Sequence, residues 1–401
     1  MRPRLATEAK RASLPAALSR AWHLLTGEYP PQPGGVSDYT AQLARSLAAA
    51  GDEVHVWAPT TAEGTGEEAG ITVHRLPDRF GPRGLRALSA ELDALPPGRI
   101  LVQYVPHAFG YRGMNVPFCL WLLARRRERV WVMFHEVHFP WARERLALNV
   151  LAAATRAMAA LLVRRADRIF VSIPAWAKLL PLGLRPGAPE PLWLPIPSNL
   201  PPPTALPPRK APDPSRVVLG HFGTYGGLIS TQLEGMLPPI LVSHPERHVR
   251  LLGRSSEAFA QRLLATHPEL SRQVTAAGAM PPEAVQAELL ACDVLLQPYP
   301  DGISARRTSA MAGLALGLPM VTNAGHLTEP YWREHRPVAL APSPDVGGLV
   351  AETEALLARP AEWTTLGARA RDAYARDFSL RRTLEVLTRA AQEEEQAFRT
   401  R

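Results

Sequence analysis

The sequence predicts an α/β protein with two domains, each built on a parallel sheet, and a cleft between them. Short apolar runs alternate with helical patterns along residues 21–185. The alternation stops in a proline-rich stretch, residues 186–214, and starts again at residue 216. Buried strands separated by helices are typical of parallel sheets covered on both faces. A chain of 401 residues is also long enough for two such domains.

In the first half, apolar or β-branched runs indicate strands at residues 22–26, 53–58, 71–76, 99–104, 129–134 and 167–172. The clearest helical pattern covers residues 37–50 and is ended by Gly51, with Ser37 or Asp38 as the expected cap. The second half repeats this arrangement and ends in a long helix near residues 379–398. Its expected strands lie at residues 216–221, 248–252, 273–277, 293–298, 319–322 and 337–341.

The composition favours a globular protein with anionic partners. The chain is 46% hydrophobic, 20% charged and carries a formal net charge of +8. Its basic residues are scattered, and no zinc-finger or RRM-like pattern accompanies them, so nucleic acid is not an expected partner. Cys119 and Cys292 are the two cysteines, which excludes a disulfide framework and fits a reducing cytoplasm.

No signal peptide or transmembrane helix is expected. The first 20 residues are basic but lack an apolar core and a cleavage site. The longest apolar stretch, residues 146–163, contains Arg156. Its basic borders, with a cluster of arginines at residues 125–129, leave open a peripheral contact with an anionic membrane surface.

The stretch "PYPDGISARRTSAMAGLALGLP", residues 298–319, places two adjacent arginines where a strand gives way to a helix. A helix N-terminus carries partial positive charge, so cations there are locally unfavourable. Guanidinium groups are well matched to phosphate. Arg306 and Arg307 therefore indicate an anionic ligand such as a diphosphate.

Four segments, in order, resemble GT-B glycosyltransferases of the group 1 (family 4) type. They are "YPPQPGGVSDYTAQLARSLAAAGDEVHVW", "VWVMFHEVHFPW", "LGHFGTYGG" and "DVLLQPYPDGISARRTSAMAGLALGLPMVTNAGHLTE". The resemblance covers roughly residues 21–390. It implies two Rossmann-like domains whose parallel sheets face a central cleft. It also implies transfer of a sugar from a nucleotide-diphosphate sugar with retention of anomeric configuration. It also implies that the acceptor binds the first domain and the nucleotide the second.

On this basis the chain is divided into five parts: a mobile basic extension (1–20), an acceptor-side domain (21–190), a proline-rich linker (191–214), a nucleotide-sugar-binding domain (215–378) and a C-terminal helix (379–401). The last helix is expected to pack back on the first domain.

The sequence departs from the family pattern in two places. Family members commonly have E-x7-E in the donor helix, but here the paired positions are Ser304 and Ala312, or Asp301 and Ser309, depending on the anchor of the alignment. The usual R-x4-K pair is also absent from the first loop of the second domain. Arg306 and Arg307 are then candidates to take over the phosphate charge.

The candidate site residues fall into three groups. The catalytic candidates are His135, Glu136 and Asp301. The acceptor-side candidates are His107 and His138. The donor-binding candidates are Gly34, Gly35, Gly223, Thr224, Tyr225, Gly226, Arg254, Ser304, Arg306, Arg307, Thr308 and Glu329.

The resulting hypothesis is a cytoplasmic, metal-independent retaining glycosyltransferase without a cofactor. Its partners are a nucleotide-sugar donor and a carbohydrate or lipid-linked acceptor, with peripheral contact at the inner membrane surface left open. The chain has no Asp-x-Asp pair, and His135 with His138 lacks a third metal ligand. The alternatives are a GT-B-fold epimerase or phosphorylase, and a non-catalytic carbohydrate-assembly partner, which the missing E-x7-E motivates.

Overall fold

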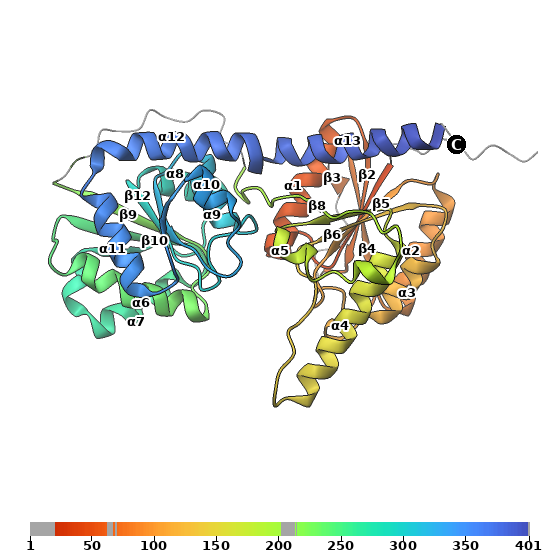
Figure 1. Cartoon of the computed structure of the whole chain (residues 1–401), viewed down its shortest axis with the longest axis horizontal. Helices are drawn as coiled ribbons and strands as arrows, with labels where there is room; N and C mark the ends of the chain where they lie inside the picture. The colour runs from red at the N-terminus through yellow and green to blue at the C-terminus, as the bar shows by residue number, and fades with distance from the viewer. Residues whose placement is uncertain (1–20, 62–66, 69, 202–212, 214, 400–401) are drawn as a thin grey trace, which may run out of the picture.

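The computed structural model describes residues 21–61, 67–68, 70–201, 213 and 215–399. These residues form two α/β domains side by side, with a helical path along one edge that crosses from the second domain to the first (Figure 1). The expected basic extension lies outside the described residues, as do residues 202–212 and 214 of the expected linker. The predicted fold class, two domains with parallel sheets, is confirmed.

The first sheet has eight described strands in the order β3-β4-β2-β1-β5-β6-β7-β8. All neighbours are parallel except β3 and β4. The six expected strands are present, whereas the two-residue strands β3 and β8 are too short for any periodicity to reveal. The bounds are β1 Ala21–Thr26, β2 Glu53–Pro59, β3 Glu67–Glu68, β4 Ile71–Leu76, β5 Arg99–Tyr104, β6 Arg129–Phe134, β7 Arg168–Val171 and β8 Leu192–Trp193.

The second sheet is parallel throughout, in the order β11-β10-β9-β12-β13-β14. All six of its strands match expected ones. The bounds are β9 Val217–Phe222, β10 Arg247–Leu252, β11 Val274–Ala276, β12 Val294–Gln297, β13 Met320–Asn323 and β14 Ala339–Ala341.

Helices cover both faces of each sheet. The first domain has α1 Gly35–Ala49, α2 Pro82–Ala94, α3 Val116–Ala124, α4 Leu146–Arg165 and α5 Pro174–Ala177. The second has α6 Gly227–Leu241, α7 Ser256–Thr266, α8 Pro282–Leu290, α9 Thr308–Ala315, α10 Tyr331–His335, α11 Val346–Leu357 and α12 Trp363–Ala373. This double cover buries both faces of the central strands, and every residue of β1, β5 and β9 is buried.

The cap of α1 differs from the expectation. The helix begins at Gly35, so neither Ser37 nor Asp38 is its N-cap, and the N-cap residue Gly34 has no side chain to offer. The carboxylate of Glu28 does this work instead: its Oε1 accepts the backbone N–H groups of Val36 and Ser37 at 3.1 and 3.0 Å. Eight or nine residues separate the partners, a distance that local capping patterns do not cover.

The last helix, α13 (Leu380–Arg399), runs back over the first domain and packs against α1 (Figure 1). Three neighbouring strands of the first sheet begin with arginine, and these side chains pair with successive glutamates of α13. The pairs are Arg99 with Glu394 and Glu395, Arg129 with Glu394, and Arg168 with Glu393. This contact lies at the amino ends of the strands, opposite the edge where ligands bind in such folds.

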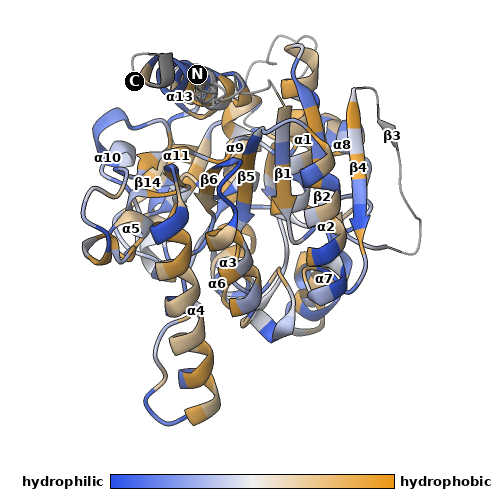
Figure 2. Cartoon of the chain, turned by 90° about the vertical axis from the view of Figure 1, so that its right-hand side faces the viewer, coloured by the Kyte–Doolittle hydropathy of each residue, from blue (hydrophilic) through white to orange (hydrophobic). Residues whose placement is uncertain are grey.

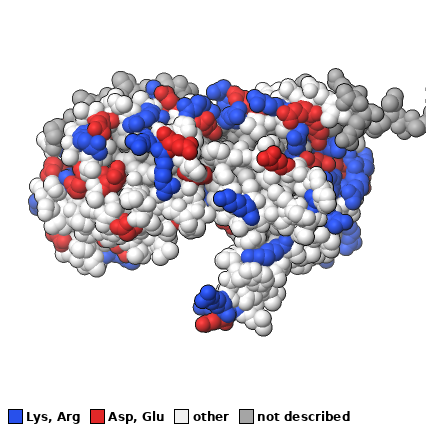
Figure 3. Space-filling view, viewed as in Figure 1, with Lys and Arg blue, Asp and Glu red and all other residues white. Residues whose placement is uncertain are grey.

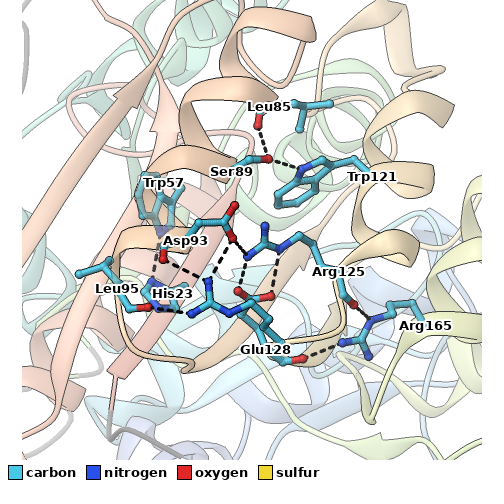
Figure 4. A network of polar contacts seen from close by, with 11 residues as sticks. His23, Trp57, Leu85, Ser89, Asp93, Leu95, Trp121, Arg125, Glu128 and Arg165 are labelled. Carbon is cyan, nitrogen blue, oxygen red and sulfur yellow. Dashed lines mark hydrogen bonds and ion pairs between the residues drawn. The ribbon is translucent and has the colours of Figure 1, made fainter.

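A polar network near the same amino-terminal edge joins α2, α3, α4 and the loop before β6 (Figure 4). Arg165 donates to the carbonyls of Arg125 and Glu128 at 2.8 and 2.7 Å and to Asp167 at 2.9 Å. Arg125 in turn donates to the buried carboxylate of Glu128 and to Asp93. The charged groups are paired, and Arg165 also donates to backbone carbonyls, so we infer that the network has a structural role.

The helix α4 projects from the first domain as an arm (Figures 1 and 2). Its C-terminal half packs against α3, while residues 146–148 and 150, in its first two turns, are exposed. By length and composition, α4 is the one helix in the described part of the chain that could cross a membrane, and a third of its most apolar window is buried.

Candidate functional site

A cleft between the domains contains two adjoining cavities. The larger, of about 430 Å³, is lined mainly by the second domain, and the smaller, of about 330 Å³, mainly by the first. Both are lined by Gly34, Gly35, Arg306 and Thr308, so the two spaces meet at these residues. We call them the donor cavity and the acceptor cavity after the roles that the sequence motifs imply.

The position of the cleft follows from the strand orders. The order reverses between β1 and β5 in the first sheet and between β9 and β12 in the second. Ligands in open α/β sheets bind at such switch points, beyond the carboxyl ends of the strands. The loops that follow these four strands all contribute lining residues, among them Gly34, His107, Gly223 and Arg306.

The loop after β12 is held rigidly before it reaches the cleft. Asn323 Oδ1 accepts the N–H of Tyr299 and its Nδ2 donates to the Tyr299 carbonyl, at 2.8 and 2.7 Å. Gly302 has φ +87°, and a Cβ there would lie 2.2 Å from the backbone nitrogen of Gly325. Only glycine fits this turn, which sets the direction in which the two arginines leave the loop.

Arg306 and Arg307 come immediately before α9, not within its first turn, and Arg307 is the N-cap residue. Both guanidinium groups converge on Asp301, Arg306 at Oδ2 and Arg307 at Oδ1. The chain thus supplies an anion of its own to the arginine pair.

Asp301 does not satisfy the arginines. The Nε atoms of Arg306 and Arg307 are buried and have no hydrogen-bond partner. Arg306 lies over the ring of Trp176 and Arg307 over that of Tyr299, with 5.6 and 4.7 Å to the centroids.

The ionisation of the cluster reflects the same excess of positive charge. Burial acts to raise the pKa of Asp301, but the adjacent Arg307 and Arg306 outweigh it and hold that pKa below its usual range. Burial, with Arg307 nearby, lowers the pKa of Arg306. Two guanidinium groups against one carboxylate leave net positive charge at the wall of the donor cavity, which both arginines line.

Glu329 and Ser304 lie behind the cavity wall and line neither cavity. The Glu329 carboxylate accepts from the Ala305 N–H at 2.9 Å and from Trp332 Nε1 at 2.7 Å, and burial raises its pKa to about 6. Ser304 is buried, and its hydroxyl has no partner. This placement favours a supporting role for Glu329, which holds the loop that carries the arginines.

On the acceptor side, His135 and Glu136 follow β6 and line the cavity together with His107. His135 Nε2 lies 2.8 Å from Gln103 Oε1, and burial lowers the pKa of His135 to about 3, so its imidazole is neutral near pH 7. Glu136 is 43% exposed and lies 3.9 Å from Arg306. His138 does not line the cavity; its Nδ1 lies 3.2 Å from the carbonyl of Phe139.

On the donor side, Gly223, Thr224 and Arg254 line the cavity. Tyr225 is buried, with its hydroxyl donated to the carbonyls of His221 and Leu252 at 3.2 and 3.3 Å. Gly226 is the N-cap residue of α6 and faces a neighbouring open hollow instead.

Several polar residues that line the cavities were not among the predicted site residues: Glu28, Asp38, Asn199, His221 and Gln297. His221 is the most informative, because its Nδ1 lies 2.7 Å from the Leu296 carbonyl while its Nε2 is buried without a partner. The fixed Nδ1–H leaves Nε2 as an acceptor at the cavity wall. One signal was available, since His221 lies within a strand that is otherwise apolar.

Comparisons with known proteins agree with this geometry. A family model described as "Glycosyl transferase 4-like domain" matches residues 34–190, which include the Gly-Gly loop and most of the first sheet. A search of curated proteins finds no significant match.

Solved structures of similar fold cover nearly the whole chain. Sucrose-phosphate synthase from Thermosynechococcus elongatus is 18% identical, with 94% of this chain and 99% of that one covered and a TM-score of 0.67. The Anabaena protein Alr3699/HepE, solved with UDP, is 14% identical, with coverage of 93% and 100% and a TM-score of 0.64. Trehalose 6-phosphate synthase from Burkholderia multivorans is 13% identical, with coverage of 96% and 99% and a TM-score of 0.61.

The chain therefore has the GT-B fold, and its residues 34–190 match the family model of glycosyl transferase 4-like domains. This confirms the resemblance to group 1 (family 4) glycosyltransferases that the four sequence segments indicate.

Proposed function

We propose that this protein transfers a sugar from a nucleotide-diphosphate sugar to a hydroxyl group of an acceptor. The observation that carries the proposal is the meeting of two cavities at Gly34, Gly35, Arg306 and Thr308. A donor in the larger cavity would bring its sugar to this junction, and an acceptor in the smaller one would reach it from the other side. Structures of the Anabaena protein with UDP and with UDP-glucose support a nucleotide-sugar donor.

The arginine pair can stabilise the diphosphate as it leaves the sugar. When the bond between the sugar and the diphosphate breaks, negative charge builds up on the leaving oxygen. Donors already aimed at that position stabilise it without reorganisation. Arg306 and Arg307 line the donor cavity, and the N-terminus of α9 begins beside them at Thr308.

Transfer with retention in a single step requires the acceptor oxygen to arrive on the face from which the diphosphate leaves. The hydroxyl proton then passes to the departing phosphate oxygen while the new bond to the sugar forms. His135 is neutral and buried beside this path, which suits a hydrogen-bonding role towards a sugar hydroxyl. Glu136 is the candidate to orient the acceptor hydroxyl.

We propose that no divalent metal takes part, because the arginines supply the charge that a metal would supply in enzymes with an Asp-x-Asp pair. Asp301, the carboxylate next to the arginines, is already engaged by both of them.

A panel of UDP-, GDP-, ADP- and dTDP-sugars, with and without monosaccharide acceptors, tests the proposed activity. We expect release of nucleoside diphosphate and a product whose anomeric proton, observed by NMR, has the configuration of the donor. An isomerised sugar formed without acceptor would indicate an epimerase. Nucleotide binding without turnover across the panel would indicate a non-catalytic partner.

We further propose that the tip of α4 touches an anionic membrane surface. Trp141, Leu146 and Val150 are 58%, 81% and 54% exposed. Arg143 and Arg145 are exposed beside them, and charge is sparse along the visible length of the arm (Figure 3). Exposed apolar side chains flanked by arginine are typical of interfacial helices. Sedimentation with vesicles containing phosphatidylglycerol should retain the wild type but lose the double variant Trp141→Ser/Leu146→Ser.

A further inference from the structure

The two cavities of the cleft differ in charge. The donor cavity is lined by Arg254, Arg306 and Arg307 against one carboxylate, Asp38. The acceptor cavity is lined by two carboxylates, Glu28 and Glu136, against Arg306 alone, which it shares with the donor cavity. An anion is therefore favoured at one end of the cleft and disfavoured at the other.

The carboxylate of Glu28 occupies the N-terminus of α1. A helix N-terminus that opens into a cleft is an anion-binding site, but here Glu28 Oε1 already accepts the N–H groups of Val36 and Ser37. A Cβ on Gly34 would lie 2.3 Å from that oxygen. At Gly34, then, the absent side chain makes room for the protein's own carboxylate, and a phosphate arriving from the acceptor side would meet negative charge.

Glu136 adds to this charge from across the cavity. It lies 3.9 Å from Arg306, whose guanidinium is bound to Asp301, and 43% of its side chain is exposed. His135, which also lines this cavity, adds no positive charge, since burial keeps it neutral near pH 7. Hydroxyl and ammonium groups can donate to such carboxylates, whereas a phosphate or carboxylate cannot.

We propose that the acceptor cavity selects a saccharide without anionic groups and prefers one that carries a free amine. The inference rests on the proposed function and narrows its acceptor class. It concerns the part of the acceptor that enters the cavity, next to Glu28 and Glu136.

Ligand-observed NMR titrations of glucosamine, glucose and glucose 6-phosphate, at pH 7 and with saturating UDP, test the preference. An ammonium close to partly exposed carboxylates should bind about two- to five-fold more tightly than the hydroxyl analogue. Glucose 6-phosphate should bind at least five-fold more weakly than glucose. Equal or tighter binding of glucose 6-phosphate overturns the inference, and so does the absence of binding by all three sugars.

Two variants assign the preference to its residues. Glu28→Gln keeps an oxygen for Val36 and Ser37 but removes the charge, and Glu136→Gln removes the exposed charge without touching a helix cap. Each should reduce the preference for glucosamine over glucose by about two-fold or more. Glu144→Gln, an exposed glutamate just before α4, is the matched control and should leave it unchanged. A preference that survives both cavity variants would contradict the assignment.

Calorimetry with UDP alone distinguishes a failure of the acceptor preference from a failure of the proposed function. Normal UDP binding with no amine preference would reject only the acceptor class. If the protein bound none of UDP, GDP, ADP and dTDP, the proposed function itself would be rejected.

Discussion

Two groups of arginines in this protein use the same pairing chemistry for different ends. At the amino-terminal edge of the first sheet, Arg125 and Arg165 donate to Glu128 and to backbone carbonyls (Figure 4). Arg165 also donates to Asp167. At the carboxyl edge of the second sheet, Arg306 and Arg307 share one aspartate, and their buried Nε atoms have no partner.

The contrast teaches that the partners of a buried arginine tell more about its role than its burial does. A buried donor left unpaired costs free energy, so a folded chain keeps few of them. Where two occur together at the carboxyl ends of the strands, where ligands bind in such folds, an incoming anion is the expected partner. The network of Arg125 and Arg165, in contrast, has its donors paired within the protein.

Acid should lower the free energy of unfolding through buried histidines in both regions, and this is the largest effect we expect. Burial lowers the pKa values of His23 and His135 to about 3 and that of His221 to about 4. The unfolded chain takes up protons below its ordinary histidine pKa of about 6.5 while the folded chain does not. Stability is therefore lost as the pH falls from about 6.5, by about 2 kcal/mol for each histidine at pH 5. Urea unfolding at pH 7 and pH 5 measures it, and equal values would show that these imidazoles are not buried as described.

Arg165→Ala should destabilise the protein without affecting the cleft, because Arg165 belongs to the polar network at the amino-terminal edge of the first sheet. Removing one partner of a buried ionic network costs about 3 kcal/mol, because the carbonyls and Asp167 lose their donor. Unfolding in urea should show this loss, while nucleotide affinity stays unchanged. Arg164→Ala, at the exposed neighbouring position, should shift stability by no more than about 0.5 kcal/mol. Equal losses of stability in the two variants would contradict a structural role for Arg165.

Arg307→Lys should sharpen the comparison from the other side. Lysine keeps the charge but loses Nε and the planar fork, so nucleoside diphosphate should bind about ten-fold more weakly, which is about 1.4 kcal/mol. Isothermal calorimetry measures the affinity, and Arg359→Lys, on an exposed pair with Glu362, is the control. A Lys variant with wild-type affinity would mean that charge alone suffices.

Chelation should have the smallest effect. If the arginines replace a metal, transfer activity in excess EDTA should stay within about two-fold of the untreated value, a barrier change of about 0.4 kcal/mol. Loss of activity that magnesium or manganese restores would show that the charge-stabilising groups are wrongly assigned.

Much of the fold follows from local pattern, since twelve strands have apolar runs that a single sequence reveals. The two-residue strands β3 and β8 do not, because their pairing depends on neighbours brought together by folding. In the site, the motifs found Arg306, Arg307, His135 and the Gly-Gly loop. They could not find the bond of Glu28 to α1 or the sharing of Asp301, because charge pairing across a loop leaves no periodic trace.

The most direct test of the account is calorimetric titration of the double variant Arg306→Ala/Arg307→Ala with the nucleoside diphosphate that the wild type binds most tightly among UDP, GDP, ADP and dTDP. Each lost charged hydrogen bond is worth about 1.5–3 kcal/mol, so the loss of two should lower the affinity by about a hundred-fold or more. The control variant Arg359→Ala should bind as the wild type does. Unchanged affinity in the double variant would contradict the claim that these two arginines hold the diphosphate.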